Sequence, residues 1–366
     1  MHNQSNKRWA AMTDRVLVTG GGGFVACHLI QQLLASGITV NTTVRNLANE
    51  AKVLPLRTLQ KQYPGRLYLF EADLLAEGAF DAPMRDCSVV HHVASPFLLP
   101  EKIKDGRREM LEPALQGTRN VLQSVDKTPS VMRVVMTSTV GAIFGDYIDV
   151  LQMSNKTLTE EYFNTSSTLE TNPYHYAKVE AEKEAWRICE AQSRWSLVTI
   201  NPGMILGPSL TPASESGSLF LLDEMFRGYF FYGMPDLSLT TVDVRDVATA
   251  HITAANKADA HGRYILAEQR MISFVEIAGI VRRLHRRPWL LPRYQIPNVL
   301  VRLIGPMFGL TQAYLSKHLG IRFSVDNQRS VNDLGVRYRS ITETLTDHYQ
   351  CWEAQRQLKG QAARNR

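Results

Sequence analysis

Short apolar runs alternate with helical apolar periodicities over the first two hundred residues of the chain. The run RVLVT at 15–19 is rich in β-branched residues, which is typical of a buried parallel strand. Apolar positions then recur at helical spacing from Phe24 to Leu34. Gly37 ends this helix, and ITVNTTV at 38–44 has the pattern of a second strand. The opening of the chain is therefore predicted to be a strand–helix–strand unit.

The same alternation continues to about residue 200. Further strands are expected at 66–70, 87–94, 131–136 and 196–200, and further helices at 47–63, at 107–125 and from Asn172 to about 192. Strands and helices in this order predict an α/β fold with a Rossmann-type, doubly wound parallel sheet. Ligands of such sheets bind outside the carboxyl ends of the strands.

The pattern loosens after Gly207, where a smaller C-terminal α/β lobe is expected. We expect a flexible extension at 1–13 and a Rossmann domain at 14–207, which the later segment at about 236–257 rejoins. Residues 208–352 are expected to form mainly a substrate-binding lobe, and 353–366 a frayed basic tail. The segment IPNVLVRLIGPMFGL at 296–310 is too short to span a bilayer. We expect it to pack within the small lobe, with contact to a membrane surface or to an apolar substrate as the alternatives.

Glycines follow the first strand directly. Gly21, Gly23 and Ala26 fit the pattern G-x-G-x-x-A, and Gly20, Gly23 and Ala26 fit G-x-x-G-x-x-A. Such a turn brings bare backbone N–H groups and a helix N-terminus to a pyrophosphate. A tight turn without a ligand is the alternative, but the flanking strands and helix favour dinucleotide binding.

The end of the second strand indicates which dinucleotide is bound. An NAD site usually has an acid there for the ribose 2′-hydroxyl, whereas this chain has Arg45, a bidentate donor suited to a 2′-phosphate. Lys52 is a second candidate for this contact. We therefore predict NADPH, with a merely solvated arginine as the alternative. Asp73, after the third strand, is predicted either to contact the adenine or to cap the following turn.

Candidate catalytic groups lie at the end of the fifth strand and on the helix opened by Asn172. Tyr174 and Lys178 are four residues apart and share a helical face, whereas Tyr176 faces elsewhere. A nearby ammonium and a cationic nicotinamide both favour the phenolate of a tyrosine, so we expect Lys178 and the cofactor to lower the pKa of Tyr174 and make it a better acid. An ordinary surface pair is the alternative for a Y-x-x-x-K spacing. The hydroxyls of 137–139 are expected on the cofactor side of the sheet.

Composition narrows the class of protein further. The 366 residues carry a net charge of +6 and are 44% hydrophobic, which is ordinary for a globular protein. The basic residues form no single block, which favours a solvated surface over nucleic-acid binding. Four scattered cysteines and the neighbouring His91 and His92 give no metal-binding pattern. No signal peptide or membrane span is recognised, so a cytoplasmic monomer or homodimer without a metal is expected.

Several of these segments together resemble the extended short-chain dehydrogenase/reductases. Within that family, the chain most resembles the subgroup that includes dihydroflavonol reductase, cinnamoyl-CoA reductase and the yeast-type ketoreductases. The resemblance covers about Arg15 to Ala267 and is carried by VTGGGGFVA, by TVR ending in Arg45, and by ADLL, VHHVASPF, NPGMILGP, VDVRDVATAH and GRYILA.

The resemblance implies a catalytic Ser/Thr, Tyr and Lys, which fall on Thr139, Tyr174 and Lys178. Ser138 is the alternative if the register of the fifth-strand motif slips. The cofactor contacts that it implies are Gly20, Gly23, Phe24, Val25, Arg45, Asp73, Leu74, Val93, Ala94, Tyr174, Lys178, Pro202 and Met204. The substrate contacts are Ser95, Val140, Phe144 and Met204, together with other residues of 140–147 and the aromatic residues of 209–235.

The expected reaction is NADPH-dependent reduction of the carbonyl of a hydrophobic ketone or aldehyde. Phe144 stands where the plant flavonoid enzymes tend to have a polar side chain, which argues against a flavanone substrate. A 3β-hydroxysteroid dehydrogenase and a nucleotide-sugar epimerase or dehydratase are the alternatives on the same scaffold. A non-enzymatic NADP-binding sensor is disfavoured because the Thr, Tyr and Lys are retained.

Overall fold

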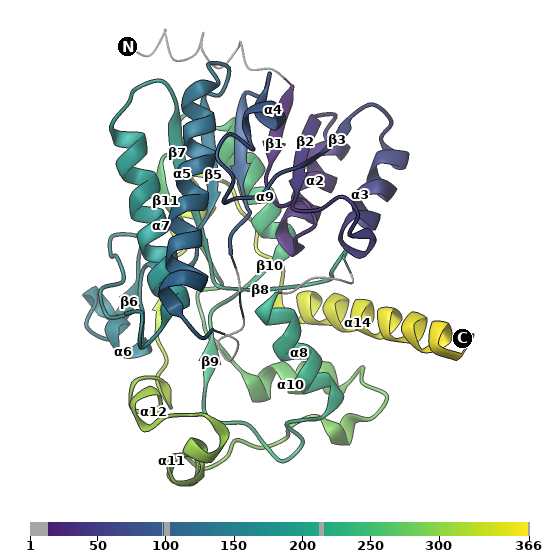
Figure 1. The fold of residues 1–366 in the computed structure, drawn as a ribbon. Helices are drawn as coiled ribbons and strands as arrows, with labels where there is room; N and C mark the ends of the chain where they lie inside the picture. The colour runs from purple at the N-terminus through teal and green to yellow at the C-terminus, as the bar shows by residue number, and fades with distance from the viewer. Residues whose placement is uncertain (1–13, 97, 99–102, 212–215, 365–366) are drawn as a thin grey trace.

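The computed structural model describes residues 14–96, 98, 103–211 and 216–364. Within them, seven parallel strands form one sheet in the order β3-β2-β1-β4-β5-β7-β11 (Figure 1). The strands are β1 (Arg15–Val18), β2 (Thr39–Val44), β3 (Leu67–Glu71), β4 (Val89–His92), β5 (Arg133–Thr137), β7 (Ser196–Pro202) and β11 (Gly262–Leu266). The direction of winding reverses between β1 and β4, where such sheets bind their ligands.

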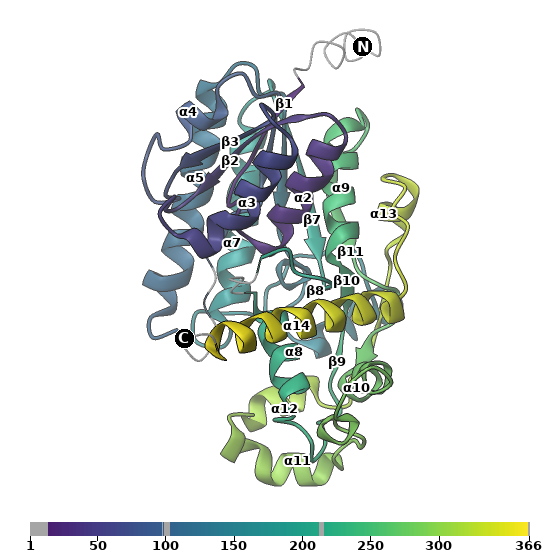
Figure 2. The same cartoon turned by 90° about the vertical axis from the view of Figure 1, so that its right-hand side faces the viewer.

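Helices cover both faces of the sheet, as expected from the alternating pattern (Figures 1 and 2). One face carries α2 (Phe24–Ala35), α3 (Glu50–Gln62) and α9 (Val244–Asn256), and the other carries α4 (Asp81–Met84), α5 (Glu112–Lys127) and α7 (Pro173–Glu190). Within β1, Val16 and Val18 enter the first of these cores and Leu17 enters the second. A strand buried on both faces explains why RVLVT is apolar without alternation.

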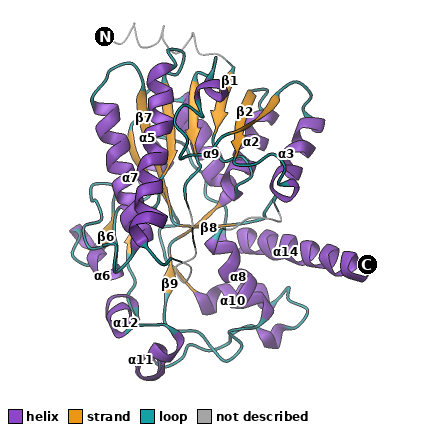
Figure 3. Cartoon of the chain, in the orientation of Figure 1, coloured by secondary structure: helices purple, strands orange, loops and turns teal. Residues whose placement is uncertain are grey.

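The C-terminal part of the chain forms a smaller lobe beyond the carboxyl ends of the strands (Figures 1 and 3). Its helices are α8 (Gly217–Arg227), α10 (Phe274–Arg282), α11 (Asn298–Ile304), α12 (Gln312–His318) and α14 (Ile341–Arg364). Helix α6 (Tyr147–Val150) lies in the connection after β5, and α13 (Gln328–Asn332) packs beside β11 at the edge of the sheet (Figure 2). Short strand pairs complete it: β8 (Met204–Leu206) with β10 (Thr241–Asp243), β9 (Ser238–Leu239) with β12 (Ile272–Ser273), and β6 (Thr157–Leu158) with β13 (Ser324–Val325).

Several boundaries differ from the sequence-based expectation. The helix expected from 107 begins with a π-helical turn at Arg107–Leu111, and α5 follows it. The segment 238–243 forms two short strands separated at Thr240, because β9 pairs with β12 and β10 pairs with β8. Residues 353–364 continue α14 instead of fraying. The buried part of α14 packs Leu345 and Tyr349 into the small-lobe core, and helix extension beyond such an anchor adds one hydrogen bond per residue.

Two other expectations concern the ends of the fold and the apolar segment 296–310. The predicted extension at 1–13 lies outside the described residues. The segment 296–310 packs within the small lobe through Val301, next to Leu315 and Leu319, but much of its apolar surface is exposed. Among the described residues, no helix is both long enough and apolar enough to cross a bilayer.

Candidate active site

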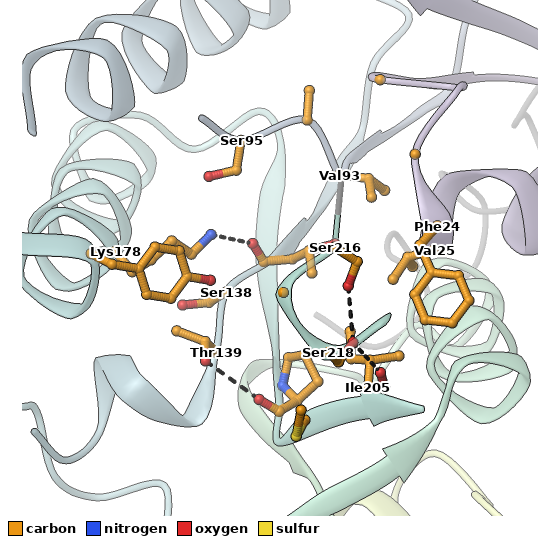
Figure 4. A pocket seen from close by; sticks show the side chains of 18 of the residues that line it. Phe24, Val25, Val93, Ser95, Ser138, Thr139, Lys178, Ile205, Ser216 and Ser218 are labelled. Carbon is orange, nitrogen blue, oxygen red and sulfur yellow. Dashed lines mark hydrogen bonds between the residues drawn. The ribbon is translucent and has the colours of Figure 1, made fainter. Parts of the chain in front are cut away.

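A cavity of about 850 Å³ opens at the carboxyl ends of the strands, between the sheet and the small lobe. Phe24 and Val25, from the start of α2, lie on one side of it, and Ser138, Thr139 and Lys178 lie on the opposite side (Figure 4). Pockets for small ligands commonly measure about 300–1,000 Å³, so this one suits a large ligand.

The glycine-rich turn forms one end of the cavity. Gly20 has φ +71°, which favours glycine, and a Cβ on it would lie 3.0 Å from the Cβ of Ala94. A Cβ on Gly21 would lie 2.2 Å from Oγ1 of Thr42, so this turn has no room for a side chain. Gly23 is the N-cap of α2; no side chain caps this helix, and its first turn carries no acid. These features fit a pyrophosphate group, which would lie close to the backbone of the turn and face the uncapped, positive end of the α2 dipole.

The polar rim near β2 contains the residues predicted to select the dinucleotide. Arg45 is exposed and lines the cavity together with Asn46, Asn49 and Lys52. Ala72 and Leu74 line it from the end of β3.

Asp73 does not line the cavity. Its Oδ1 accepts a hydrogen bond from the backbone N–H of Leu75 at 2.9 Å. Of the two interpretations of Asp73, the structure contains the capping interaction, and the adenine contact stays a prediction.

The hydroxyls of Ser138 and Thr139 have different surroundings. Thr139 is extended and half-buried; its Oγ1 accepts a hydrogen bond from Gly141 N–H at 3.2 Å and lies 3.5 Å from the carbonyl oxygen of Pro202. Ser138 Oγ instead donates to the carboxylate of Glu182, and this serine is buried. Both residues line the cavity, but the Ser138 hydroxyl is bonded to a buried carboxylate, whereas the Thr139 hydroxyl has only the 3.5 Å contact as a donor.

Tyr174 and Lys178 lie on consecutive turns at the start of α7, and both line the cavity. Asn172 fixes this end of the helix, because its Oδ1 accepts a hydrogen bond from His175 N–H at 3.0 Å, and Pro173 occupies the first helical position. Lys178 Nζ donates to the carbonyl oxygen of Thr137 at 3.0 Å. The helix thereby places its two polar side chains against the end of β5.

The pKa of Tyr174 differs from the sequence-based expectation. Burial raises it to about 12, and the expected lowering by Lys178 is not found. Burial also lowers the pKa of Lys178 to about 8, so its amino group is still mostly protonated at neutral pH. Because its own pKa is about 12, the Tyr174 phenol keeps its proton at neutral pH and can serve as a donor.

Glu182, which the sequence analysis did not single out, lies one turn after Lys178 and is fully buried. Its carboxylate accepts hydrogen bonds from Arg263 Nε at 2.6 Å, from Asn201 Nδ2 at 2.9 Å and from Ser138. These contacts tie α7 to β5, β7 and β11. The four-residue step from Lys178 was a signal in the sequence, because it places a carboxylate on the same helical face.

The part of the cavity under the small lobe is mainly aromatic. Predicted residues Val140, Phe144 and Met204 line it, together with Tyr147. It also contains His175, Tyr314 and His318, which no sequence pattern had indicated. Tyr314 and His318 come from α12, well over a hundred residues after Tyr174, so only tertiary packing brings them here.

The aromatic residues expected from 209–235 lie elsewhere in the described structure. Phe226 is buried against Tyr349 and Trp352, whereas Phe231 and Tyr232 are exposed. Within 209–211 and 216–235, the residues at the cavity wall are Ser216, Gly217 and Ser218. Helix α8 turns its aromatic face toward the small-lobe core, which leaves only its small N-terminal residues for the cavity.

Most residues that the resemblance implies share this one cavity, although their roles stay predictions. The cavity wall includes Gly20, Gly23, Phe24, Val25, Arg45, Leu74, Val93, Ala94, Ser95, Thr139, Val140, Phe144, Tyr174, Lys178, Pro202 and Met204. His91 and His92 lie on β4 behind it: His92 Nδ1 is 3.1 Å from Thr19 Oγ1, and the ring of His91 lies beside that of His251.

Comparison with known proteins places this fold and cavity in a family. Residues 16–267 match the model of the NAD dependent epimerase/dehydratase family. A cinnamoyl-CoA reductase of Medicago truncatula is 37% identical over 285 residues, which cover 77% of this chain and 82% of that protein. An anthocyanidin reductase of Arabidopsis thaliana is 36% identical over 296 residues, covering 79% and 83%.

A similar solved structure is that of the yeast methylglyoxal/isovaleraldehyde reductase Gre2, which was determined with NADPH. It is 26% identical, with a TM-score of 0.76, and the match covers 93% of this chain and 99% of the yeast protein. The match to the family model spans the glycine-rich turn, the fifth-strand hydroxyls and the Tyr–Lys pair. The chain therefore belongs to the NAD dependent epimerase/dehydratase family, within the extended short-chain dehydrogenase/reductases, and is an oxidoreductase.

Proposed function

We propose that this protein is an NADPH-dependent reductase that converts the carbonyl of a hydrophobic ketone or aldehyde into an alcohol. The observation that carries the proposal is the shared cavity. It joins a glycine-rich helix N-terminus and Arg45 to a second wall that holds Thr139, Tyr174 and Lys178. A nucleotide site and a proton donor in one enclosure are what hydride transfer to a carbonyl requires.

NADPH is the proposed cofactor. The uncapped N-terminus of α2 would hold the pyrophosphate, and Arg45 would pair with the 2′-phosphate by charge-assisted hydrogen bonds. Lys52 lies on the same rim and adds positive potential. The NADPH in the structure of the yeast relative supports this choice. When bound, NADPH supplies the hydride that is transferred from its nicotinamide ring.

Three side chains of the protein act on the substrate and its proton. Thr139 Oγ1 donates a hydrogen bond to the carbonyl oxygen and fixes its position. Tyr174 gives that oxygen its phenolic proton as the carbonyl carbon receives the hydride, which leaves an alcohol and an oxidised cofactor. Lys178 bonds the ribose hydroxyls and, when protonated, stabilises the phenolate of Tyr174 until a solvent proton restores it.

The hydroxyl environment supports Thr139 as the carbonyl-binding residue in place of Ser138. Ser138 donates a hydrogen bond to the buried carboxylate of Glu182, and its hydroxyl could turn toward a substrate only by breaking that bond. Thr139 makes only a long contact of 3.5 Å to Pro202 as a donor.

The substrate class follows from the cavity wall. Val140, Phe144 and Met204 supply apolar surface, and Tyr147 is packed against Phe144 with ring centroids 6.1 Å apart. Such walls favour an aromatic or aliphatic group next to the carbonyl. Reduction is the proposed direction, because cells keep their NADP pool mostly reduced.

The test is the oxidation of NADPH by the purified protein with a panel of aromatic aldehydes, aliphatic aldehydes, ketones and 3-ketosteroids, repeated with NADH. We expect NADPH oxidation with at least one apolar carbonyl and a much lower rate with NADH. A preparation that carries tightly bound NAD and interconverts nucleotide sugars would contradict the proposal and support an epimerase. Turnover restricted to the 3-ketosteroids would instead identify a 3β-hydroxysteroid dehydrogenase.

A further inference from the structure

Apolar side chains are exposed together on α11 and the turn that follows it. We name this set the α11 surface; its members, with their exposed fractions, are Val299 at 81%, Leu300 at 43%, Leu303 at 76%, Met307 at 84% and Phe308 at 69%. Val299, Leu303 and Met307 follow one another at steps of four residues. Single exposed apolar residues are common, whereas a contiguous group of this size indicates an interaction site.

The α11 surface is not a misassigned piece of the protein core. On the other side of α11, Val301 is buried and already packs with Leu315 and Leu319. Helix α11 lies at the end of the small lobe farthest from the parallel sheet in both views (Figures 1 and 2). The exposed side chains therefore project away from the described body of the protein.

Aromatic side chains extend the apolar character of this lobe. Tyr294 is 72% exposed and comes four residues before α11, and Trp289 is 62% exposed. Phe231 is 63% exposed and lies near Met234 in the chain. Two hydrogen bonds join this segment to the one with Tyr294: Met234 N–H donates to the Tyr294 carbonyl, and Ile296 N–H donates to the Met234 carbonyl. Tyrosine and tryptophan are the side chains that favour the interface between water and lipid.

The segment that carries this surface contains basic residues and no acidic ones. Residues 277–325 contain eight lysines and arginines and no aspartate or glutamate. Three of these cations pair with acids from other segments: Arg286 with Glu353, Lys317 with Asp146, and Arg322 with Asp236.

Four further arginines of this segment could interact with a binding partner outside the protein. Arg283, Arg287, Arg293 and Arg302 are exposed and form no ion pair within the part of the chain that the structure describes. Arg293 lies five residues before α11, and Arg302 lies in its last turn. This part of the small lobe therefore combines exposed apolar side chains with arginines that form no ion pair among the described residues.

From this juxtaposition we infer that the α11 surface binds the face of an anionic lipid bilayer. Val299, Leu303, Met307 and Phe308 enter the boundary between headgroups and acyl chains, and the neighbouring arginines contact lipid phosphates. The segment is too short to span, so the protein lies on the membrane. A second copy of the chain fits less well, because a symmetric contact would bring the two cationic surfaces together.

Binding through the α11 surface would also fix how the cavity lies relative to the membrane. Helix α12 begins four residues after Phe308, and its Tyr314 is 40% exposed while lining the cavity. The bilayer contact and one wall of the substrate site thus belong to consecutive elements. The lipid-binding proposal itself stands on the surface alone and does not depend on the reaction.

Vesicle sedimentation tests the inference. The full chain is mixed with vesicles of phosphatidylcholine alone or with about one third phosphatidylserine, at low and at high salt. We expect the protein to sediment with the anionic vesicles and to be released by salt. The double variant Leu303→Glu/Met307→Glu is expected to bind at least about tenfold more weakly, because charges resist entering the apolar boundary. Arg293→Gln/Arg302→Gln should weaken binding in the same direction and reduce its dependence on salt.

Matched variants separate this effect from general changes in surface. Leu54→Glu/Leu358→Glu changes leucines that are 56% and 66% exposed elsewhere, and Arg85→Gln/Arg337→Gln removes two other exposed arginines. Both are expected to bind vesicles as the unmodified chain does, with unchanged melting temperatures in all four variants.

Three results would overturn the inference. The first is no sedimentation with anionic vesicles, and the second is equal binding by the α11 variants and their controls. The third is a dimer in sedimentation velocity that Leu303→Glu/Met307→Glu converts to monomer while vesicles bind nothing, which would make the surface a subunit interface.

Discussion

At the residue scale, neighbouring side chains in the cavity differ sharply in what they can do. Ser138 and Thr139 both line the cavity, but the Ser138 hydroxyl donates to the buried Glu182 carboxylate, whereas the Thr139 hydroxyl has only a 3.5 Å contact as a donor. Tyr174 lines the cavity, whereas Tyr176, two residues later, does not. The alternation of directions along a strand and around a helix thus selects one hydroxyl and one phenol.

Tyr174→Phe is expected to abolish carbonyl reduction and to leave NADPH binding nearly intact. The change removes the proton donor but keeps the ring, so kcat should fall by about a hundredfold or more. Steady-state NADPH oxidation measures the loss, and quenching or enhancement of NADPH fluorescence measures binding. Tyr176→Phe is the control and should keep its activity. Full activity in Tyr174→Phe would show that another group supplies the proton.

Lys178→Met is expected to make the protein more stable at neutral pH while impairing activity. Burial lowers the pKa of Lys178 from 10.5 in the unfolded chain to about 8, so between these values the unfolded state binds more protons. The stability of the unmodified protein therefore rises with pH across this window. The free energy of unfolding of Lys178→Met should exceed that of the unmodified protein by up to about 3 kcal/mol near pH 7, and the two should differ little near pH 10.

Thermal unfolding from pH 7 to 10 checks this expectation. Lys183→Met, a change at an exposed lysine of the same helix, should show no such trend with pH. If Lys178→Met were less stable at every pH, the hydrogen bond to the Thr137 carbonyl would outweigh the cost of burying the ammonium.

At the scale of elements, the site depends on how closely β1, α2 and β2 approach one another. The turn from Gly20 to Gly23 has no room for side chains, since Thr42 of β2 lies directly against Gly21. Thr42 is in turn held by a hydrogen bond from its Oγ1 to the carbonyl of Val18 at 2.7 Å. The close approach of strand and turn therefore shapes the start of α2, where the cofactor is proposed to bind.

Gly21→Ala is expected to destabilise the fold by about 1–3 kcal/mol and to weaken NADPH binding, because its Cβ would overlap Thr42. In Gly21→Ala/Thr42→Ala the clash is relieved, so the two changes should cost less together than the sum of each alone. Chemical denaturation measures both. Gly279→Ala is the control, since nothing lies within 4 Å of its new Cβ. Strict additivity would argue against the clash.

Helix α7 is held to the sheet by a buried charge network as well as by apolar packing. Glu182 is fully buried, and Arg263 of β11, its partner at 2.6 Å, also donates to backbone carbonyls of the segment between β6 and α7. Removing one partner of such a pair leaves an uncompensated charge, so the network constrains α7 strongly. This explains how Tyr174 and Lys178 keep a fixed place relative to Thr139.

At the scale of the whole molecule, the cavity joins the sheet to the small lobe, so a ligand that fills it should stabilise the entire fold. NADPH at a hundred times its dissociation constant should raise the free energy of unfolding by about 2.7 kcal/mol, because it binds only the folded state. NADH should do much less at the same concentration.

Arg45→Ala tests the origin of that difference. It should remove most of the preference for NADPH and leave the smaller effect of NADH unchanged, since only the 2′-phosphate contact is lost. Differential scanning fluorimetry with both cofactors checks this, with Arg57→Ala as the matched arginine control on α3. An undiminished preference in Arg45→Ala would assign the phosphate contact to other residues, with Lys52 the first to test.

Much of this architecture could be read from local patterns. Buried parallel strands are apolar along their whole length, so RVLVT and its successors mark the sheet, and glycines directly after a strand mark the nucleotide turn. Tyr174 and Lys178 follow from helical periodicity, and Arg45 from its place at the end of β2. These features depend on neighbours within a few residues, where the periods of helix and strand govern side-chain direction.

Other features arise only when distant segments pack together. The pKa of Tyr174 depends on burial, which no local pattern gives, and the expected influence of Lys178 was wrong for this reason. Glu182 meets Arg263, 81 positions later, and Tyr314 reaches the cavity from α12. The order of residues thus determines the strands, the helices and the chemical groups, whereas desolvation and contacts between distant segments decide which of these groups meet.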